Sequence, residues 1–280
     1  MTSELIHKTS HLATLIRRSG AALIAYSGGV DSALVLAVAQ RELGNRCLAC
    51  IAVSPSYPAR EQRAAQELAA SIGAACRLIE TDEHHDPRYA ANAADRCYVC
   101  RSGLFRRLRR IADDEGWASI LDGVHVDDLA DHANGMRAAR EFGVRSPLLE
   151  AGLDKSDIRA LAREMGLKVW DKPAAACLAS RVPRGVPITP ALLAQIDAAE
   201  AVVAAMGFRA FRVRHHGDVA RLELPAVELP RAIELRESLV AGLQGCGYRF
   251  VTLDLAGFRS GSLAAASGPP APQIVSLRVR

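Results

Sequence analysis

The chain has 280 residues, half of them apolar, and a formal net charge of +4 at neutral pH. No apolar run approaches the roughly 18 residues needed to cross a membrane. Residues 1–20 carry charges throughout and lack the apolar core of a signal peptide. These features argue against a membrane-spanning or exported protein and favour a cytoplasmic enzyme. The mild charge suits anionic small molecules better than a nucleic-acid duplex.

The first part of the chain, to about residue 170, alternates between predicted strands and helices. The predicted strands are Ala21–Tyr26, Leu48–Val53, Cys76–Glu80 and Ser119–Gly123. The predicted helices are Glu4–Arg18, Ala33–Leu43, Ala59–Ile72, Arg101–Asp114 and Lys155–Met165. Such alternation predicts an α/β fold, a doubly wound parallel sheet that binds ligands at the carboxyl ends of its strands.

The basic stretch Arg106–Arg110 falls within one of these predicted helices. Its arginines interleave with Phe105, Leu108 and Ile111 at helical spacing. We therefore interpret the stretch as the solvated face of an ordinary helix, in preference to an RNA-binding patch.

The pattern changes after residue 170. A loop rich in proline and glycine spans 171–188, and a second set of elements follows. These are a helix at Pro190–Met206, a hairpin of Phe211–His215 and Val219–Leu224, a helix at Leu229–Gly242 and a strand at Arg249–Asp254. They predict a smaller α+β domain. We expect an ATP-binding domain at 1–170, the loop and substrate-binding domain at 171–261, and a mobile tail at 262–280.

A glycine-rich turn joins the first predicted strand to the helix after it. Its sequence is Ser27-Gly-Gly-Val-Asp-Ser32. Gly28 and Gly29 let backbone N–H groups approach an anion, and the helix directs its positive end at the same place. Ser27 and Ser32 add hydroxyl donors, and Asp31 can bind a Mg²⁺ that bridges phosphates. Nucleoside-triphosphatase loops have a lysine after the glycines, and this turn has none, so it is not of that type. It resembles the PP-loop of the ATP pyrophosphatases.

Cysteine supplies the second chemical signal. Seven cysteines in a chain without an export signal do not suggest a disulfide framework. Core packing accounts for four of them, namely Cys47, Cys50, Cys76 and Cys246. Cys97 and Cys100 form a C-x-x-C just before a predicted helix, in a polar segment, where a redox pair, a zinc half-site or part of an iron–sulfur site is possible. Cys177 lies among small residues in the irregular loop, and Arg181 nearby could activate it.

Six segments, in chain order, carry a resemblance to the LarE family of ATP-dependent sulfur transferases, which make the nickel-pincer nucleotide cofactor. They are Ala25–Ser32, Leu121–Gly123, Arg145–Glu150, Trp170–Arg181, Phe211–His215 and Tyr248–Gly261. The resemblance therefore covers nearly the whole chain. It implies that the carboxylate of a pyridinium mononucleotide is adenylylated by ATP with release of pyrophosphate, and that sulfur then displaces AMP to leave a thiocarboxylate.

The resemblance also implies roles for individual residues. It implies that the glycine-rich turn binds Mg²⁺ and the phosphates of ATP. It also implies that Arg212, Arg214 and Arg259 bind the substrate's own phosphate. Arg212 and Arg214, two apart on a strand, share one face and can converge on one anion. Ser180 and Arg181 match positions beside the reactive sulfur of Cys177, and Glu200 also aligns.

Two sulfur sources occur in this family. Some members sacrifice the sulfur of the cysteine that matches Cys177. Others add a C-x-x-C, and the three thiolates resemble a ligand set for a [4Fe–4S] cluster with one open iron that binds exogenous sulfide. Cys97 and Cys100 place this chain with the second group.

Other functions remain open on the residues alone. A different PP-loop enzyme, such as a tRNA thiolase or an amide-forming synthetase, would share the glycine-rich turn. A tRNA enzyme would carry a strongly basic surface or zinc-ribbon cysteine pairs, and an amide-forming enzyme has no use for three such cysteines. A non-catalytic nucleotide sensor is disfavoured by the intact Asp31 and Ser32. The resemblance further implies a homo-oligomer, a hexamer, without nucleic-acid or membrane partners.

Overall fold

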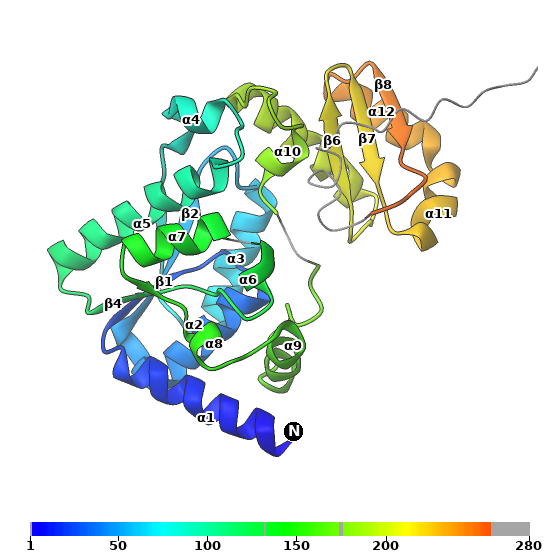
Figure 1. Ribbon diagram of the computed structural model, residues 1–280. Coiled ribbons are helices and arrows are strands. Elements are labelled where there is room, and N and C mark those ends of the chain that lie inside the picture. Colours follow the sequence, from blue (N-terminus) through cyan, green and yellow to red (C-terminus); the bar gives the residue numbers. More distant parts are fainter. Residues whose placement is uncertain (1, 132, 174–175, 259–280) are drawn as a thin grey trace, which may run out of the picture.

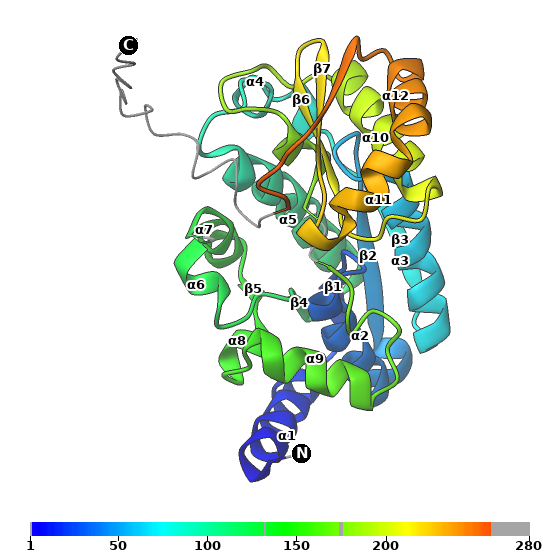
Figure 2. The same cartoon turned by 90° about the vertical axis from the view of Figure 1, so that its right-hand side faces the viewer.

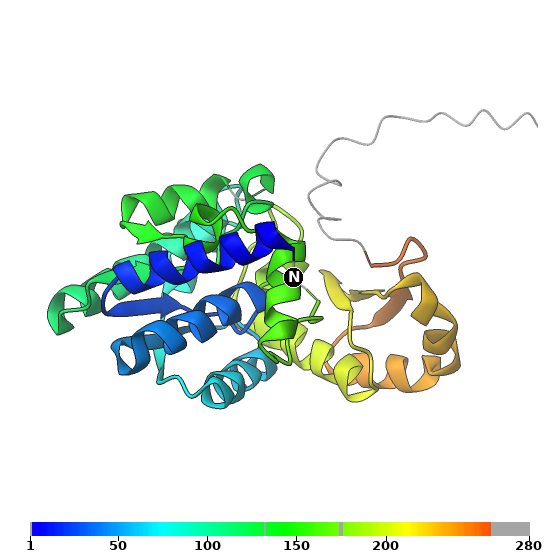
Figure 3. The ribbon, with the colours of Figure 1, turned by 90° about the horizontal axis from the view of Figure 1, so that it is seen from below.

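The computed structural model describes residues 2–131, 133–173 and 176–258. Figure 1 shows two parts, each built around its own sheet, with the first about twice the length of the second in sequence. Figure 3 shows these parts side by side, with α1 running along the larger one. Among the described residues, no helix has both the length and the apolar character that crossing a bilayer requires.

The larger part contains five parallel strands in the spatial order β3-β2-β1-β4-β5. They are β1 (Ala22–Ala25), β2 (Cys47–Val53), β3 (Cys76–Glu80), β4 (Ser119–Leu121) and β5 (Val144–Arg145). The strand order reverses beside β1, which pairs with β2 on one side and β4 on the other. In doubly wound sheets, ligands bind at such a switch point, outside the carboxyl ends of the strands. The predicted α/β fold with a doubly wound parallel sheet is confirmed.

Helices cover both faces of this sheet. One face packs against α1 (Ser3–Arg18), α2 (Val30–Leu43), α3 (Ala59–Ile72), α8 (Pro147–Glu150) and α9 (Lys155–Glu164). The other packs against α5 (Arg96–Glu115) and α7 (Ala133–Glu141). Successive strand residues point to opposite faces, so Ile24 belongs to the first core and Leu23 to the second. Both residues are fully buried, as the apolar run of the sequence predicts for a central parallel strand.

The smaller part has a three-stranded sheet in the order β6-β7-β8. Its strands are β6 (Arg212–His216), β7 (Val219–Glu223) and β8 (Phe250–Leu253), and its helices are α10 (Pro190–Ala205), α11 (Leu229–Glu234) and α12 (Arg236–Gly245). The predicted hairpin is present, with β6 and β7 antiparallel, while β8 pairs with β7 in parallel. Figure 2 shows this sheet and its helices gathered at one end of the molecule.

Several short elements differ from the sequence-based prediction. Strand β5 and helices α4 (Pro87–Ala90), α6 (Asp128–Asp131) and α8 were not expected, because two-residue and four-residue elements leave no periodicity to detect. The nine-residue helix α7 was also missed. Helix α5 begins at Arg96, five residues before the predicted start, so Cys97 and Cys100 lie within its first turns and not before it. The predicted helix at Leu229–Gly242 is divided at Leu235 into α11 and α12. The tail at 262–280 lies outside the described residues.

Candidate functional site

A cavity of about 520 Å³ opens at the carboxyl ends of β1, β2, β3 and β4. Its walls come from segments that are distant in the sequence. The predicted site residues among them are Ser27, Asp31, Ser32, Cys100, Cys177 and Arg212. The fold therefore brings the phosphate loop, two of the three candidate thiols and one arginine of the predicted clamp to a single space.

The loop between β1 and α2 has the geometry of a phosphate cradle. Gly28 has a φ of 66°, and a Cβ there would lie 2.6 Å from the Cβ of Ala65, so only glycine fits. Gly29 is the N-cap of α2, and no side chain caps this helix. The N–H groups of the first turn therefore suit an anion. The hydroxyl of Ser32 accepts from the N–H of Ser27 and donates to the carbonyl of Gly29, both at 3.2 Å, and so holds the loop closed.

Asp31 projects from the first turn of α2 and is bound by a lysine. The Nζ of Lys155 lies 2.6 and 2.7 Å from the two carboxylate oxygens of Asp31. The Nε2 of His125 lies 3.7 Å from one of the same oxygens. Asp154 caps the helix that Lys155 begins, and the backbone N–H of Lys155 donates to Asp127 at 2.8 Å. Lys155 and His125 were not among the predicted site residues, although Lys155 stands at the start of a predicted helix.

Asp122 and Gly123 follow β4 and approach the same loop. A Cβ on Gly123 would lie 2.8 Å from the backbone nitrogen of Ser32, so this close approach requires glycine. Asp122 is buried, and burial raises the pKa of its carboxyl group. Its Oδ1 accepts from Ser146 at 2.7 Å, whereas its buried Oδ2 has no hydrogen-bond partner among the described residues.

Two carboxylates therefore face the phosphate loop, those of Asp31 and Asp122. Among residues 2–131, 133–173 and 176–258, no three His, Cys, Asp or Glu side chains converge as a complete ligand set for a metal ion. Magnesium that enters with ATP needs only one or two protein carboxylates, because phosphate oxygens and water complete its shell. The Oδ2 of Asp122 has no hydrogen-bond partner among the described residues and lies 3.9 Å from the guanidinium of Arg101. This oxygen and the oxygens of Asp31 fit that requirement.

The three candidate cysteines lie near one another but differ in exposure. Cys100 and Cys177 both line the cavity, and Cys97 is exposed on the first turn of α5. Burial, and next the charge of Glu83, raise the pKa of the Cys100 thiol. Glu83 is itself 5% exposed, and its Oε2 has no hydrogen-bond partner among the described residues. Two thiols thus face the cavity, and the third lies one helical turn from Cys100.

The loop that carries Cys177 is held at several points. Cys177 is the N-cap of a short 3₁₀ helix at Leu178–Arg181, and the N–H of Leu178 donates to the carbonyl of Ser56 at 2.8 Å. The guanidinium of Arg181 donates to the carbonyls of Ala176 and Cys177, at 2.8 and 3.2 Å, and to the hydroxyl of Ser180 at 3.0 Å. Arg181 therefore fixes the backbone on both sides of the thiol.

A buried glutamate orients Arg181. Two parallel bonds of 2.8 and 3.0 Å join its guanidinium to the carboxylate of Glu200, and both residues are buried. Glu200 also accepts from the N–H of Val213 on β6 at 3.1 Å. The pair thus ties the cysteine loop to the smaller sheet. Glu200, which aligned with the family without a clear role, is a buried partner and not an exposed helix-face carboxylate.

The two described arginines of the predicted clamp are placed differently. Arg214 forms an ion pair with the buried Glu223 at 3.0 Å and donates to the carbonyl of Ser180 at 2.6 Å. Arg212 lines the cavity and lies over the ring of Phe258, 5.0 Å from its centroid. Burial, followed by the positive charges of Arg181 and Arg214, lowers the pKa of Arg212 to about 10. Arg259 lies outside the described residues.

A lysine of the segment after residue 170 reaches back to the phosphate loop. The Nζ of Lys172 lies 2.7 Å from Glu61 and 3.3 Å from the carbonyl of Gly28. Tyr57 donates to the carbonyl of Ser27 at 2.8 Å. These contacts link the phosphate loop to the loop that leads to Cys177. The sequence analysis quoted Lys172 within a matching segment but gave it no role.

Comparison with known proteins agrees with this geometry. No protein-family model matches the chain. An uncharacterized protein of Synechocystis sp. is 44% identical over 245 residues, which span 86% of this chain and 91% of that protein. The pyridinium-3,5-bisthiocarboxylic acid mononucleotide synthase of Lactiplantibacillus plantarum is 39% identical over 241 residues, 86% of this chain and 87% of the synthase.

A more distant relative is also a PP-loop enzyme. The tRNA-specific 2-thiouridylase of Azorhizobium caulinodans is 29% identical over 194 residues, 54% of this chain and 48% of that enzyme. Its similarity is limited to about half of each chain, whereas the similarity to the synthase extends over most of both. This chain therefore belongs to the LarE family of PP-loop enzymes and is an ATP-dependent sulfur transferase.

Proposed function

We propose that the protein adenylylates carboxylates of a pyridinium mononucleotide with ATP and converts them to thiocarboxylates, a step in making a nickel-pincer nucleotide cofactor. The name of the Lactiplantibacillus relative describes that product. The observation that carries the proposal is that Cys100 and Cys177 line the same cavity as Ser27, Asp31 and Ser32. An enzyme that activates a carboxylate and then transfers sulfur to it needs phosphate binding and a sulfur site within reach of one substrate.

The first half-reaction falls to the phosphate loop. Ser27, Gly28, Gly29 and Ser32 bind the phosphates of ATP, and Asp31 with Asp122 binds the Mg²⁺ that neutralises them. A carboxylate oxygen of the substrate forms a bond to the α-phosphorus, and the bond from that phosphorus to the β-phosphate oxygen breaks. Pyrophosphate leaves with its charge on the β-phosphate oxygen. Lys155 provides an ammonium group beside Asp31, where this charge develops.

The second half-reaction falls to the cysteine loop. Cys97, Cys100 and Cys177 would hold a [4Fe–4S] cluster, which supplies an open iron position for exogenous sulfide when bound. Arg181 and Ser180 orient the loop beside the acyl-adenylate. The thiols of Cys100 and Cys177 at the cavity support this assignment, and Cys97 lies one turn away on α5. In the part of the chain that the structure describes, the three thiols do not converge as a ligand set. The alternative is that Cys177 gives up its own sulfur, and its position in the cavity is equally suited to that.

The substrate's phosphate falls to the smaller part of the chain. Arg212 contacts it from the cavity wall. The family resemblance assigns the same phosphate to Arg259. Arg214 contributes by holding the cysteine loop through the carbonyl of Ser180, which supports a positioning role. In this proposal residues 1–170 bind ATP and residues 171–261 bind the mononucleotide. The family resemblance further suggests a cytoplasmic homo-oligomer, a hexamer.

The test is a two-stage assay without oxygen. The protein is mixed with ATP, Mg²⁺ and the biscarboxylate form of the mononucleotide, and pyrophosphate is measured before any sulfur source is added. Sulfide is then added, and mass spectrometry detects replacement of oxygen by sulfur in the nucleotide. Pyrophosphate release that depends on the mononucleotide, followed by a thiocarboxylate product, supports the proposal. Pyrophosphate release that requires tRNA or ammonia in its place would contradict it.

A further inference from the structure

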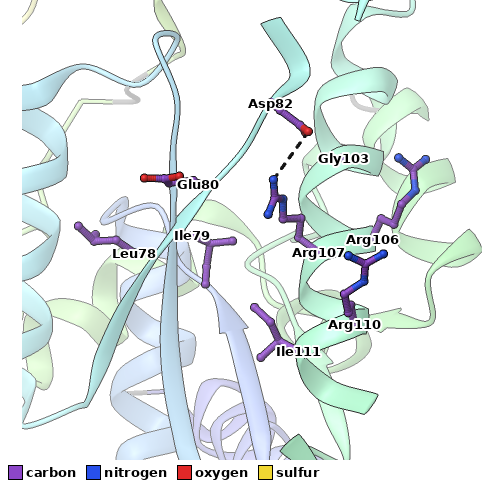
Figure 4. Close-up of a pocket in the computed structure, with 9 residues that line it drawn as sticks. All are labelled: Leu78, Ile79, Glu80, Asp82, Gly103, Arg106, Arg107, Arg110 and Ile111. Carbon is purple, nitrogen blue, oxygen red and sulfur yellow. Dashed lines mark ion pairs between the residues drawn. The ribbon is translucent and has the colours of Figure 1, made fainter. Parts of the chain in front are cut away.

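A second cavity lies away from the phosphate loop, between β3 and α5. It has a volume of about 520 Å³ and an apolar floor that includes Ile79 and Ile111. Three arginines of α5 form part of its lining, namely Arg106, Arg107 and Arg110. Figure 4 shows Arg107 turned toward Asp82, with the guanidinium groups of Arg106 and Arg110 one above the other along the helix. We refer to this cavity as the β3–α5 groove.

Two ion pairs show that β3 and α5 run antiparallel along the groove. Arg77 at the start of β3 pairs with Glu115 at the end of α5, at 2.6 Å. Asp82, just after β3, pairs with Arg107 in the middle of α5, at 3.7 Å. The groove between these bridges has the length of a five-residue strand, about 16 Å.

One side of the groove is an open sheet edge. Strand β3 pairs with β2 and is the last strand in the order on that side. The carbonyl of Ala75 accepts from Ala49 at 2.9 Å, and the N–H of Thr81 donates to Val53 at 3.0 Å. Because backbone groups alternate in direction along a strand, those of Cys76, Leu78 and Glu80 point away from β2. Leu78 is 44% exposed, which is high for a leucine of a parallel sheet.

The spacing of Arg106 and Arg110 matches that of alternate residues in an extended chain, and their positive charge favours acidic side chains there. Arg106 and Arg110 are one helical turn apart, about 6 Å, and alternate residues of an extended chain are about 6.6 Å apart. In the part of the chain that the structure describes, neither of these two exposed guanidinium groups forms an ion pair within 4.0 Å, and Arg106 lies over the ring of Phe142, 5.8 Å from its centroid. Acidic side chains at every second position of an added strand could therefore pair with both.

We propose that the β3–α5 groove is a docking surface for an extended acidic segment of a partner protein, which adds to the sheet as a sixth strand beside β3. The open strand edge supplies main-chain hydrogen bonds, and Arg106 and Arg110 select acidic side chains at the alternate positions that face α5. The intervening side chains lie on the face of the exposed Leu78. This inference stands on the groove alone and does not depend on the proposed function.

The position of the groove suggests why a partner would bind there. Gly103, which lines the groove, follows Cys97 by six residues on α5, a rise of about 9 Å. Asp82, at the same end of the groove, precedes Glu83 of the functional cavity. A partner docked along β3 therefore ends about 9 Å along α5 from the exposed Cys97. The geometry suits a protein that exchanges sulfur with this enzyme.

The experiment uses the full-length protein and a fluorescent peptide of alternating glutamate and valine, with a lysine–valine peptide for comparison. Anisotropy measures binding. The double variant Arg106→Glu/Arg110→Glu should weaken the acidic peptide by about tenfold or more. The matched double variant Arg18→Glu/Arg63→Glu changes the net charge equally at exposed arginines on α1 and α3, and should bind as the parent does.

A backbone variant tests strand addition itself. Leu78→Pro removes an N–H that points away from β2, a change that edge strands tolerate, and it should also abolish peptide binding. Pyrophosphate release reports whether this variant is folded. Hydrogen exchange at Leu78 and Glu80 should slow when the peptide binds.

Four outcomes would overturn the proposal. The lysine peptide could bind equally well, or Leu78→Pro could leave binding unchanged. Inorganic triphosphate could displace the peptide without any protection of the Leu78 and Glu80 amides, which would make the groove an anion site. Sedimentation could show that a second copy of the chain covers β3 in the free protein, so that the peptide does not bind.

Discussion

The ammonium group of Lys155 lies 2.6 and 2.7 Å from the two carboxylate oxygens of Asp31. Both residues line the cavity at the carboxyl ends of β1, β2, β3 and β4. These residues are far apart in sequence and meet because α9 packs beside α2. The pair places a cation at the point where the phosphates of ATP and their Mg²⁺ are proposed to bind.

Asp31→Ala should reduce pyrophosphate release on the order of a hundredfold or more, because loss of a Mg²⁺ ligand removes several kcal/mol of transition-state stabilisation. The fold should survive, since the side chain does little packing, and circular dichroism checks that. Asp114→Ala, at an exposed position of α5, is the control. Unchanged adenylylation in Asp31→Ala would contradict the nucleotide assignment.

Lys155→Ala separates the role of the ammonium from that of the carboxylate. We expect slower pyrophosphate release with little change in mononucleotide affinity, because Lys155 lies on the phosphate side of the cavity. Lys155→Arg should restore part of the rate, since it keeps the charge but not the geometry. Single-turnover measurement of pyrophosphate is the assay. A normal rate in Lys155→Ala would confine this residue to a structural role.

Local sequence was sufficient to predict that a glycine turn joins β1 to α2, because strand, glycines and helix start are contiguous and each has its own signal. That this turn binds phosphate stays a prediction. The partners of that loop could not be predicted in this way. Lys155 and Asp122 reach it through tertiary packing, and Lys172 reaches it from a loop without periodicity. Hydrophobic periodicity records which face of an element is buried, but not which polar groups meet across the sheet.

Arg212 and Arg214 show the same limit of prediction from sequence. The alternation of side chains on a strand predicts that Arg212 and Arg214 share a face, and both are buried on β6. It does not reveal that Glu223 of the neighbouring strand lies beside Arg214, or that Arg214 binds the carbonyl of Ser180. The expected roles of the two residues therefore diverge only once the pairing of β6 with β7 is known.

Arg212→Ala should impair substrate binding, whereas Arg214→Ala should mainly lower stability. Arg212→Ala should weaken binding of the mononucleotide far more than binding of ATP, with a small effect on unfolding. Arg214→Ala should lower the free energy of unfolding by roughly 2–4 kcal/mol, because the fully buried Glu223 loses one ion-pair partner and keeps the more exposed Arg221. Calorimetric titration with each ligand and denaturant unfolding check the two effects. Equal loss of ATP binding in Arg212→Ala would mean that the two phosphate pockets are assigned the wrong way round.

Asp122 gives a pH-dependent prediction. Burial raises the pKa of its carboxyl group above the usual 3.8, so the folded state holds this proton more tightly than the unfolded state does. The contribution of Asp122 to stability therefore falls as pH rises from 3.8 through the folded pKa, and stays unfavourable above it.

Asp122→Asn should accordingly be more stable than the parent at neutral pH, and this gain should disappear in acid below the unfolded pKa. The same variant should lose pyrophosphate release, because it removes a proposed Mg²⁺ ligand. Denaturant unfolding at several pH values measures the first effect, with Asp114→Asn as the control. A variant that is destabilised at neutral pH would show that the charged carboxylate has a compensating partner in the folded state.

The cysteines decide how sulfur is supplied. If a cluster forms, Ala at Cys97, Cys100 or Cys177 should each remove most of the iron from protein purified without oxygen. Ala at the four other cysteines, Cys47, Cys50, Cys76 and Cys246, should leave the iron in place. Cys47 and Cys50 are buried, and Ala there should cost packing on the order of 1–2 kcal/mol, whereas Cys76 is exposed, so the core-packing prediction was wrong for it and Ala there should cost little. Iron and acid-labile sulfide analysis distinguishes these sets. Cys47 and Cys50 are the stringent controls because both are buried.

Mass spectrometry of the protein after one turnover then separates the two sources. An intact Cys177 with continued turnover on added sulfide supports the cluster. A protein lighter by the mass of hydrogen sulfide at Cys177, with no iron bound, would show that this cysteine gives up its own sulfur. In that case Cys97 and Cys100 should be replaceable by Ala without loss of the single turnover. The phosphate loop and Arg212 would keep their roles under either result, because adenylylation precedes the sulfur step.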